Sequence, residues 1–311
     1  MSPRQIHYYD RRSGAICTEP VFAARLLFWS YDNRLGRVLG QLLLRQPLLS
    51  RIFGWFNRCA FSRRRIGPFA RAMGVNVAEC LRPLAGYRSF NDFFIREIDL
   101  AQRPVDAEPL ACVAPADGRI FVLPSVDPQR RFCIKGGQFV LRDFLANAEL
   151  TRRFAGGALA IIRLHLADYH HFHFPVSGVP LSPWLVGRRL HAVGPYARRW
   201  PVPFFSENRR MLTLIRTPHC GLAGMAEIGA CTVGSIRQTF RPAEPVDKGA
   251  RKGYFETGGS TIVLLFQPGA MRFDDDLCAQ SASGTETYVR MGERIGTCQR
   301  GSCEERYAGS I

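Results

Sequence analysis

The 311-residue sequence lacks any apolar run of about 18 residues, the length that an α-helix needs to cross a bilayer. It also lacks internal repeats and low-complexity tracts, so no repeat architecture is expected. No apolar stretch follows the polar first residues, and we therefore expect no signal peptide. Ten cysteines are present without a Cys-x-x-Cys pair. This pattern favours reduced thiols in a cytosolic compartment over a disulfide framework.

Acidic residues are scarce, because 26 aspartates and glutamates oppose 42 lysines and arginines and leave a net charge of +16. Residues 1–72 hold thirteen arginines and three acidic residues, so this first quarter carries +10 of the total. Such an imbalance favours an anionic partner, either nucleic acid or a membrane surface. No RNA-binding or helix-turn-helix signature accompanies the basic residues. The sequence therefore predicts a membrane partner and no nucleic acid.

The first hundred residues are typical of helices. Thr18 is placed to cap one helix with Pro20 in its first turn, and Ser89 is placed to cap another before Phe90. Between them, apolar residues with arginines beside them follow a helical stripe: Leu35, Val38, Leu39, Leu42 and Leu43. Two interpretations stay open, namely amphipathic helices packed on the core and helices that lie in a membrane interface.

From about residue 110 the pattern changes to short apolar runs separated by glycine and proline. Strands are predicted at residues 119–123, 158–166, 211–216, 229–236 and 261–266. The polar residues from Cys298 onward are expected to fray. The sequence thus predicts an α+β protein with two parts. Residues 1–105 form a helical, basic, membrane-facing region, and residues 106–311 form a β-rich core that resembles a barrel or sandwich.

Two short segments contain side chains suited to catalysis. Asp117 precedes a glycine, which is a common turn pair, and its carboxylate could instead orient a histidine. Four of the seven histidines lie within nine residues: His165, His170, His171 and His173. A metal site is one interpretation, but no cysteine or glutamate nearby completes a familiar ligand set. Structural roles and acid–base catalysis are the other two interpretations.

A third segment places Ser260 between Gly258-Gly259 and the apolar run 261–266. A lone serine at the entrance of a strand is usually structural, and no Gly-x-Ser-x-Gly elbow surrounds this one. Together with Asp117 and His173 it could complete a nucleophilic triad, because such triads are defined by geometry and not by order. A serine after glycine can attack its own upstream carbonyl if a base and a suitable backbone are present.

These segments resemble the phosphatidylserine decarboxylase proenzymes, which depend on a pyruvoyl group. The resemblance covers most of the chain and follows the family's order. It rests on residues 6–14, 31–37, 90–97, 103–104, 115–118, 168–173, 208–210, 227–230 and 249–261. His171 departs from the pattern, because the family commonly has arginine there, and this puts a phosphate contact from that position in doubt.

The resemblance implies that Asp117, His173 and Ser260 form a self-processing triad. His173 would take the proton of Ser260, Asp117 would orient His173, and Ser260 would attack the carbonyl of Gly259. The chain would break between Gly259 and Ser260 into a large chain, 1–259, and a small chain, 260–311. The small chain would begin with a pyruvoyl group, which is the covalently bound pyruvate cofactor.

The resemblance also implies the reaction, in which the pyruvoyl group forms a Schiff base with phosphatidylserine and takes up the electrons left by CO₂. The product would be phosphatidylethanolamine. His170 is the candidate acid or substrate-recognising residue, and Asp168 would support the histidine cluster. No metal is expected.

The implied partners are phosphatidylserine, an anionic membrane surface, and the two processed chains as a heterodimer, with further dimerisation left open. The implied location is peripheral, on the cytoplasmic face of the cell membrane, without a transmembrane helix. Three alternatives remain: a pyruvoyl-dependent decarboxylase of a soluble amino acid, a non-catalytic membrane-binding protein, and a histidine-ligated metal hydrolase.

Overall fold

The structure is a computed structural model that describes residues 5–20, 47–129, 132–134, 137–187, 204–229, 236–258 and 260–299. Its strands are β1 (Ile6–Asp10), β2 (Ala15–Glu19), β3 (Ala111–Val113), β4 (Gly118–Leu123), β5 (Phe132–Ile134), β6 (Gly137–Phe139), β7 (Leu159–Leu164), β8 (His171–His173), β9 (Val179–Pro180), β10 (Trp184–Val186), β11 (Arg210–Thr217), β12 (Gly221–Gly229), β13 (Ile236–Gln238), β14 (Arg251–Phe255), β15 (Ser260–Phe266), β16 (Met271–Phe273), β17 (Thr287–Val289) and β18 (Arg294–Cys298). Its α-helices are α3 (Pro47–Arg58), α4 (Ile66–Met73), α5 (Phe90–Phe94), α6 (Leu141–Leu145), α7 (Ala148–Phe154), α8 (Phe204–Glu207) and α9 (Asp275–Ala282). Short 3₁₀ turns are η1 (Ala60–Arg65), η2 (Val77–Glu79), η3 (Leu84–Gly86) and η4 (Leu100–Gln102).

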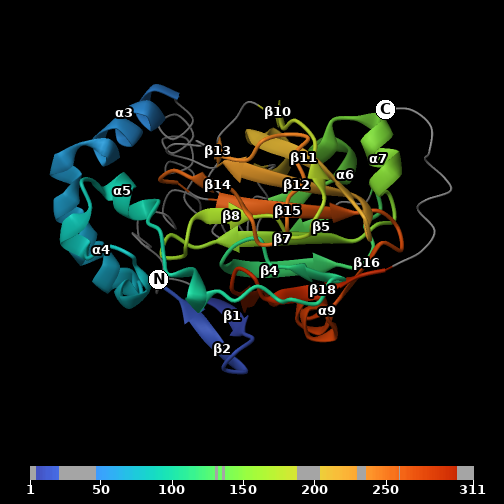
Figure 1. The fold of residues 1–311 in the computed structure, drawn as a ribbon, viewed down its shortest axis with the longest axis horizontal. Helices are drawn as coiled ribbons and strands as arrows, with labels where there is room; N and C mark the ends of the chain where they lie inside the picture. The colour runs from blue at the N-terminus through green and yellow to red at the C-terminus, as the bar shows by residue number, and fades with distance from the viewer. Residues whose placement is uncertain are drawn as a thin grey trace.

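One large sheet organises the described residues (Figure 1). Its strand order is β10-β11-β12-β15-β7-β4-β17-β1-β2, and β9 pairs with β11 beside this path. Neighbours in this sheet are antiparallel except β1 and β17, which are parallel. Smaller sheets have the orders β13-β14-β8, β16-β18-β3 and β5-β6.

The central strand β15 is buried on both faces, which explains its unbroken apolar sequence. Ile262, Leu264 and Phe266 point into one hydrophobic cluster, whereas Val263 and Leu265 point into another. The first cluster also contains residues of the smaller sheets, among them Phe172 of β8 and Phe255 of β14. The second contains residues of α6 and α7. The large sheet therefore lies between α6, α7 and the β5-β6 sheet on one face and the other two small sheets with α9 on the other face.

This arrangement confirms the predicted β-rich core. The runs 119–123, 158–166, 211–216 and 261–266 correspond to β4, β7, β11 and β15. The run 229–236 overlaps the end of β12 and the start of β13, and the residues between these strands lie outside the described ones.

The helices α3, α4 and α5 gather at one end of the molecule, away from α6 and α7 (Figure 1). Apolar residues of α4 and α5 form a third cluster, which includes Phe69 and Phe93. Ser89 caps α5 as predicted, because its side chain accepts a hydrogen bond from the backbone N of Asp92 at 3.1 Å. The leucine stripe between residues 35 and 43 lies outside the described residues. Within the described part of the chain, no helix is both long and apolar enough to span a bilayer.

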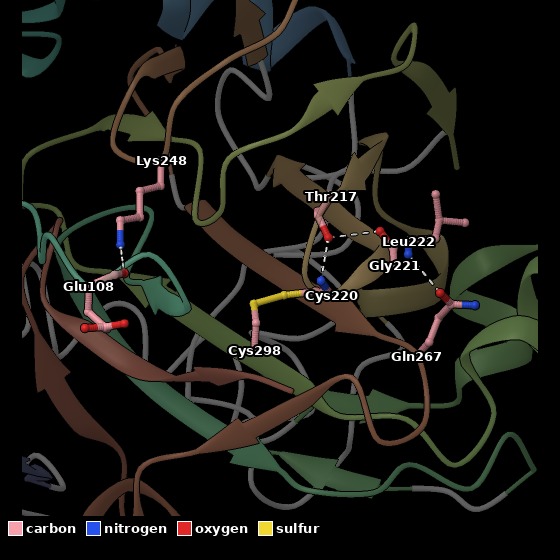
Figure 2. The surroundings of a disulfide bond; sticks show 8 residues. All are labelled: Glu108, Thr217, Cys220, Gly221, Leu222, Lys248, Gln267 and Cys298. Carbon is pink, nitrogen blue, oxygen red and sulfur yellow. Dashed lines mark hydrogen bonds between the residues drawn. A yellow bond between two sulfur atoms is a disulfide. The ribbon is translucent and has the colours of Figure 1, made fainter. Parts of the chain in front are cut away.

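The structure corrects three expectations for smaller features. Thr18 does not cap a helix, because it lies in β2, which forms a hairpin with β1 and extends the large sheet. Cys298 itself is not frayed, because it is 4% exposed at the end of β18, and the expectation for residues 300–311 concerns residues outside the described ones. It forms a disulfide with Cys220, so the prediction of reduced thiols fails for this pair (Figure 2). The two partners are 78 positions apart, a separation that gives no local signal in the sequence.

Candidate active site

Ser260 is the first residue of β15 and is 2% exposed. It pairs with Gly229 of β12 and Leu164 of β7, so it enters the middle of the large sheet. Its Oγ donates a long hydrogen bond of 3.5 Å to the carbonyl oxygen of Gly258. Gly258 has a φ of 157°, a value that residues with side chains rarely adopt. Gly259, the other residue of the predicted cut, lies outside the described residues.

His173, on β8, is held in one tautomer by a backbone carbonyl. Its Nδ1 lies 2.8 Å from the carbonyl oxygen of Gly249, which can only accept, so Nδ1 carries the proton. Its Nε2 therefore keeps a lone pair, and this atom is buried without a partner among the described residues. Burial lowers the pKa of His173 to about 4, so the ring is neutral at pH 7. This is the state that a general base requires.

His170 has the same arrangement. Its Nδ1 lies 2.9 Å from the carbonyl oxygen of Asp168, which leaves a lone pair on a buried Nε2 without a partner in the described structure. Burial and the nearby Arg96 guanidinium lower the pKa of His170 to about 3. Its ring lies against Phe94 of α5, with centroids 3.9 Å apart. His170 is thus neutral in this state. Its Nε2 must accept a proton before the ring can act as an acid.

The other two histidines of the cluster are also fixed by backbone groups. The Nε2 of His171 lies 2.9 Å from the carbonyl oxygen of Ile95, and the Nε2 of His165 lies 2.8 Å from that of Pro20. Burial lowers the pKa of His171 to about 4. Among the described residues, no group of histidine, cysteine or carboxylate side chains has the arrangement of a metal site.

Asp117 is buried, but no hydrogen bond joins its carboxylate to the ring of His173. Its carboxylate accepts hydrogen bonds from Arg103, with Nε at 2.9 Å and Nη2 at 2.8 Å, and from the backbone N of Met291 at 2.9 Å. The two segments meet instead through the backbone, because the N of His173 donates to the carbonyl oxygen of Pro115 at 2.8 Å. The predicted direct orientation of His173 by Asp117 is therefore absent here, since Arg103 and Met291 supply the donors.

Asp168 binds the segment that carries the histidine cluster. Its Oδ2 accepts from the backbone N of His165 at 2.6 Å and from Arg119 Nη1 at 2.5 Å. Its carbonyl oxygen accepts from both His170 and Arg96. Burial alone would raise the pKa of Asp168, but the Arg119 guanidinium and the neighbouring donors outweigh burial and hold this pKa below its usual value. Asp168 is therefore charged and fixes the loop from which His170 projects.

A buried ion network extends from this loop to the N-terminal hairpin. Glu19 of β2 binds Arg163 with two hydrogen bonds of 2.9 Å and lies 3.0 Å from Arg119 Nε. Arg163 also binds Glu286 at 2.8 Å. All of these side chains are less than 9% exposed. The hairpin thus contributes a charge to the structure that supports Asp168.

The helical end of the molecule contacts the chain just before Ser260. Asn91 of α5 binds Thr257, and Arg58 of α3 binds Glu256 at 2.5 Å. The backbone N of Phe255 donates to the carbonyl oxygen of His170 at 2.9 Å. These contacts place the segment that leads to Ser260 between the helices and the histidine cluster.

Several residues at this site carry no catalytic signal in the sequence. Asn91, Arg103 and Gly249 all lie inside segments that carried the family resemblance. The residue types alone suggest a turn for Asn91, a surface charge for Arg103 and a flexible position for Gly249. Only the fold shows what each one binds. Glu19 lies in a stretch whose residues suggest the start of a helix. No sequence pattern therefore indicates that its carboxylate binds buried arginines.

Known proteins resemble this chain closely. The sequence profile of the family described as "Phosphatidylserine decarboxylase" matches residues 90–297. The chain is 40% identical over 296 residues to the phosphatidylserine decarboxylase proenzyme of Chlamydia trachomatis serovar L2, covering 95% of this chain and 98% of the relative. The identity is 42% over 296 residues, with the same shares, for the protein of that name from Chlamydia muridarum. For that of Chlamydia caviae it is 36% over 297 residues, covering 96% and 99%.

The fold and the comparisons together define a β-rich enzyme of the decarboxylase class. The chain belongs to the phosphatidylserine decarboxylase family.

Proposed function

We propose that this chain is a proenzyme that cuts itself before Ser260 and then decarboxylates phosphatidylserine to phosphatidylethanolamine at the new chain end. The family supports the reaction. The observation that carries the assignment to Ser260 is its position, buried at the entrance of the central strand and directly preceded by a Gly-Gly pair. Gly258 of that pair has a backbone conformation that side chains disfavour.

In the proposed self-cleavage, His173 Nε2 accepts the proton of Ser260 Oγ while the oxygen attacks the carbonyl carbon of Gly259. The C–N bond between Gly259 and Ser260 then breaks, the Ser260 nitrogen takes up the proton, and an ester remains. Elimination from this ester releases the Gly259 carboxylate and leaves dehydroalanine at position 260, which water hydrolyses to the pyruvoyl group and ammonia. The carbonyl of Gly249 keeps the proton on Nδ1, so the lone pair of Nε2 remains available. Asp117 acts through the backbone in this proposal. With Arg103 it anchors the turn 115–118, and the Pro115 carbonyl of that turn fixes the position of His173.

A pyruvoyl group formed from Ser260 fits this position. The serine is almost inaccessible to water, and His170 and His173 are neutral with Nε2 atoms that have no partner among the described residues. Such a group supplies a ketone that binds the substrate's amine and withdraws the electrons released with CO₂.

His170 is the residue that we propose moves a proton in the decarboxylation. Its Nε2 can take the proton that the substrate ammonium must lose, and the resulting imidazolium can return a proton to the reacting carbon. The low pKa of His170 opposes this transfer when no negative charge of a substrate lies beside the ring. The phosphate and carboxylate of the substrate would raise that pKa, because nearby negative charge favours the protonated ring.

Membrane association is supported by the exposed apolar side chains of the helical end. Ile52 and Trp55 lie three positions apart on α3 and are 51% and 67% exposed, and Phe61 of η1 is 62% exposed. Arg64 lies over the ring of Phe61, 5.1 Å from its centroid. Aromatic side chains with arginine among them suit an interface with anionic lipid. We propose that this end binds the cytoplasmic face of the cell membrane peripherally.

The two products of the cut are proposed to stay together as a heterodimer. β15 would become the start of the small chain, yet it pairs on both sides with strands of the large chain, β12 and β7. Its side chains belong to both main hydrophobic clusters. Loss of the small chain would therefore expose the centre of the core.

The test is a denaturing gel under reducing conditions combined with mass spectrometry of the purified protein. Two chains are expected, the smaller one starting with a pyruvoyl group at position 260. Ser260→Ala should remain a single inactive chain, whereas the matched variant Ser283→Ala, at an exposed serine of the same product, should be cut like the wild type. An uncut chain in a fully active preparation would refute the proposal. Activity should persist in a chelator, and its loss would favour the metal hydrolase.

A further inference from the structure

Cys220 and Cys298 lie on opposite sides of the proposed cut. Cys220 belongs to the turn between β11 and β12 and therefore to the large chain, and Cys298 ends β18 in the small chain. Their Cα atoms are 5.2 Å apart, within the range that a disulfide spans. We infer that the Cys220–Cys298 disulfide becomes a covalent link between the two processed chains, an inference that rests on the proposed cleavage before Ser260.

The turn that carries Cys220 is fixed by its neighbours, as Figure 2 shows. Thr217 Oγ1 accepts a hydrogen bond from the backbone N of Cys220 at 2.8 Å and donates to the carbonyl oxygen of Gly221 at 3.0 Å. Gln267, the residue after β15, accepts from the backbone N of Leu222 at 2.8 Å. The large-chain turn is therefore already bound to the small chain next to the disulfide.

Cys298 is held equally firmly. It pairs with Met271 of β16, and its backbone N donates to the carbonyl oxygen of Leu110 at 2.8 Å. Cys220 and Cys298 are 1% and 4% exposed and belong to the same hydrophobic cluster. The disulfide thus joins two rigid elements, and a reductant can reach it only when the structure opens.

Formation of the bond removes two electrons and two protons from the two thiols. A small disulfide of the glutathione type is a sufficient oxidant, because it is reduced to two thiols in the exchange. The thiolate of one cysteine attacks the small disulfide and releases one thiol. The second cysteine then attacks the mixed disulfide and releases the other. Because both residues are buried in the folded protein, we expect the exchange to occur during folding, before β18 takes its place beside β16 and β3.

The link has a consequence for the processed enzyme. Cleavage creates a new N-terminal end of the small chain at β15, while the disulfide holds the same chain at β18. The two chains then unfold and refold as one covalent molecule. Recovery of activity after denaturation without reductant should be independent of protein concentration, as it is for a single chain.

The test uses the full-length protein, with thiols blocked by N-ethylmaleimide in the cells before lysis. On denaturing gels the wild type should run as one species of the whole chain's mass without reductant, and as two chains with dithiothreitol. Cys220→Ser and Cys298→Ser should each give two chains on both gels. Cys278→Ser, which removes a free cysteine of the small chain, should behave like the wild type.

Two chains from the blocked wild type without reductant would overturn the inference, as would a single species from Cys220→Ser. A chain that stays whole with dithiothreitol would instead refute the proposed cleavage, and with it a link between products. Peptide mapping of that whole chain would then decide separately whether Cys220 and Cys298 are bonded.

Discussion

Asn91 accepts two hydrogen bonds from Thr257 through one oxygen, Oδ1. The backbone N of Thr257 lies 3.1 Å from it and the Oγ1 lies 2.8 Å from it. Both residues are less than 9% exposed. Asn91 belongs to α5 of the helical end, and Thr257 precedes Ser260 by three positions. The helical end therefore positions the chain that leads into the proposed cut.

Thr257→Val should slow self-cleavage, because it keeps the shape of the side chain and removes the hydroxyl that binds Asn91. One buried hydrogen bond contributes about 1 kcal/mol, so a roughly fivefold to tenfold slower cut is expected if the bond persists in the transition state. The measurement is the time course of conversion of the single chain into two chains on denaturing gels. Thr257→Ser keeps the hydroxyl and should be cut at nearly the wild-type rate. Equal rates for the two variants would show that this contact does not position the cut.

Much of the core could be predicted from the sequence because its strands are buried on both faces. The run 261–266 is apolar at every position except its first, and β15 indeed contacts two hydrophobic clusters. Ser89 could be recognised as a cap because capping depends on residues only three positions apart. Both patterns depend on residues that are close together in the chain, so they can be recognised in a single sequence.

Features made by distant residues could not be predicted. Thr18 has the side chain of a helix cap, but pairing with β1 and the edge of the large sheet prevails over that preference. Glu19 binds Arg163 at a separation of 144 positions, and no spacing rule connects them. The tautomer of His173 depends on the carbonyl of Gly249, a backbone atom that residue types do not reveal.

The pH dependence of self-cleavage tests whether His173 is the neutral base. Burial lowers the pKa of His173 to about 4, and protonation removes the lone pair, so the rate should fall only as the pH falls towards about 4. A flat rate is expected from about pH 8 to about pH 6. Rates would be measured on freshly refolded proenzyme, with circular dichroism at each pH. The check on folding matters because a histidine with a lowered folded pKa destabilises the protein below the unfolded value near 6.5.

His219→Gln is the matched control for this profile, because His219 is only partly buried, in the turn after β11. Its profile should match that of the wild type. A half-maximal rate near pH 6.5 in folded wild-type protein would mean that the base has an ordinary histidine pKa, contrary to the buried position of His173.

Glu19→Gln should destabilise the protein strongly, although Glu19 is far in sequence from the active site. The change leaves Arg163 and Arg119 with one negative charge fewer in a buried network, and breaking such a network costs about 3 kcal/mol. The measurement is the free energy of unfolding in urea at pH 7. Glu149→Gln removes an exposed carboxylate that pairs with Arg152 and Arg153 and should cause no measurable change. Similar losses of unfolding free energy in both variants would show that the burial of Glu19 does not explain its effect.

The pKa of Glu19 predicts the pH range in which this residue stabilises the protein. Burial alone would raise the pKa of Glu19, but the Arg163 and Arg119 guanidinium groups lower it from 4.5 to about 2. Because the folded pKa lies below the unfolded one, the contribution of Glu19 is complete above pH 4.5 and is lost as the pH falls towards about 2. The difference in unfolding free energy between wild type and Glu19→Gln should therefore shrink across that window. A difference that stays constant down to about pH 2 would assign the loss to packing instead of charge.

Trp55→Ser should weaken binding to vesicles that contain phosphatidylserine. Trp55 is 67% exposed on α3, so its removal leaves the described core intact. Transfer of a large apolar side chain from water into lipid contributes about 2 kcal/mol, which predicts roughly a tenfold to thirtyfold loss of affinity in vesicle flotation. Leu185→Ser is the control, because Leu185 is 48% exposed on β10, at an edge of the large sheet and not on the helices. If both variants float like the wild type, α3 does not bind the membrane. If the wild type itself fails to float, a soluble amino acid becomes the better substrate for the same active site.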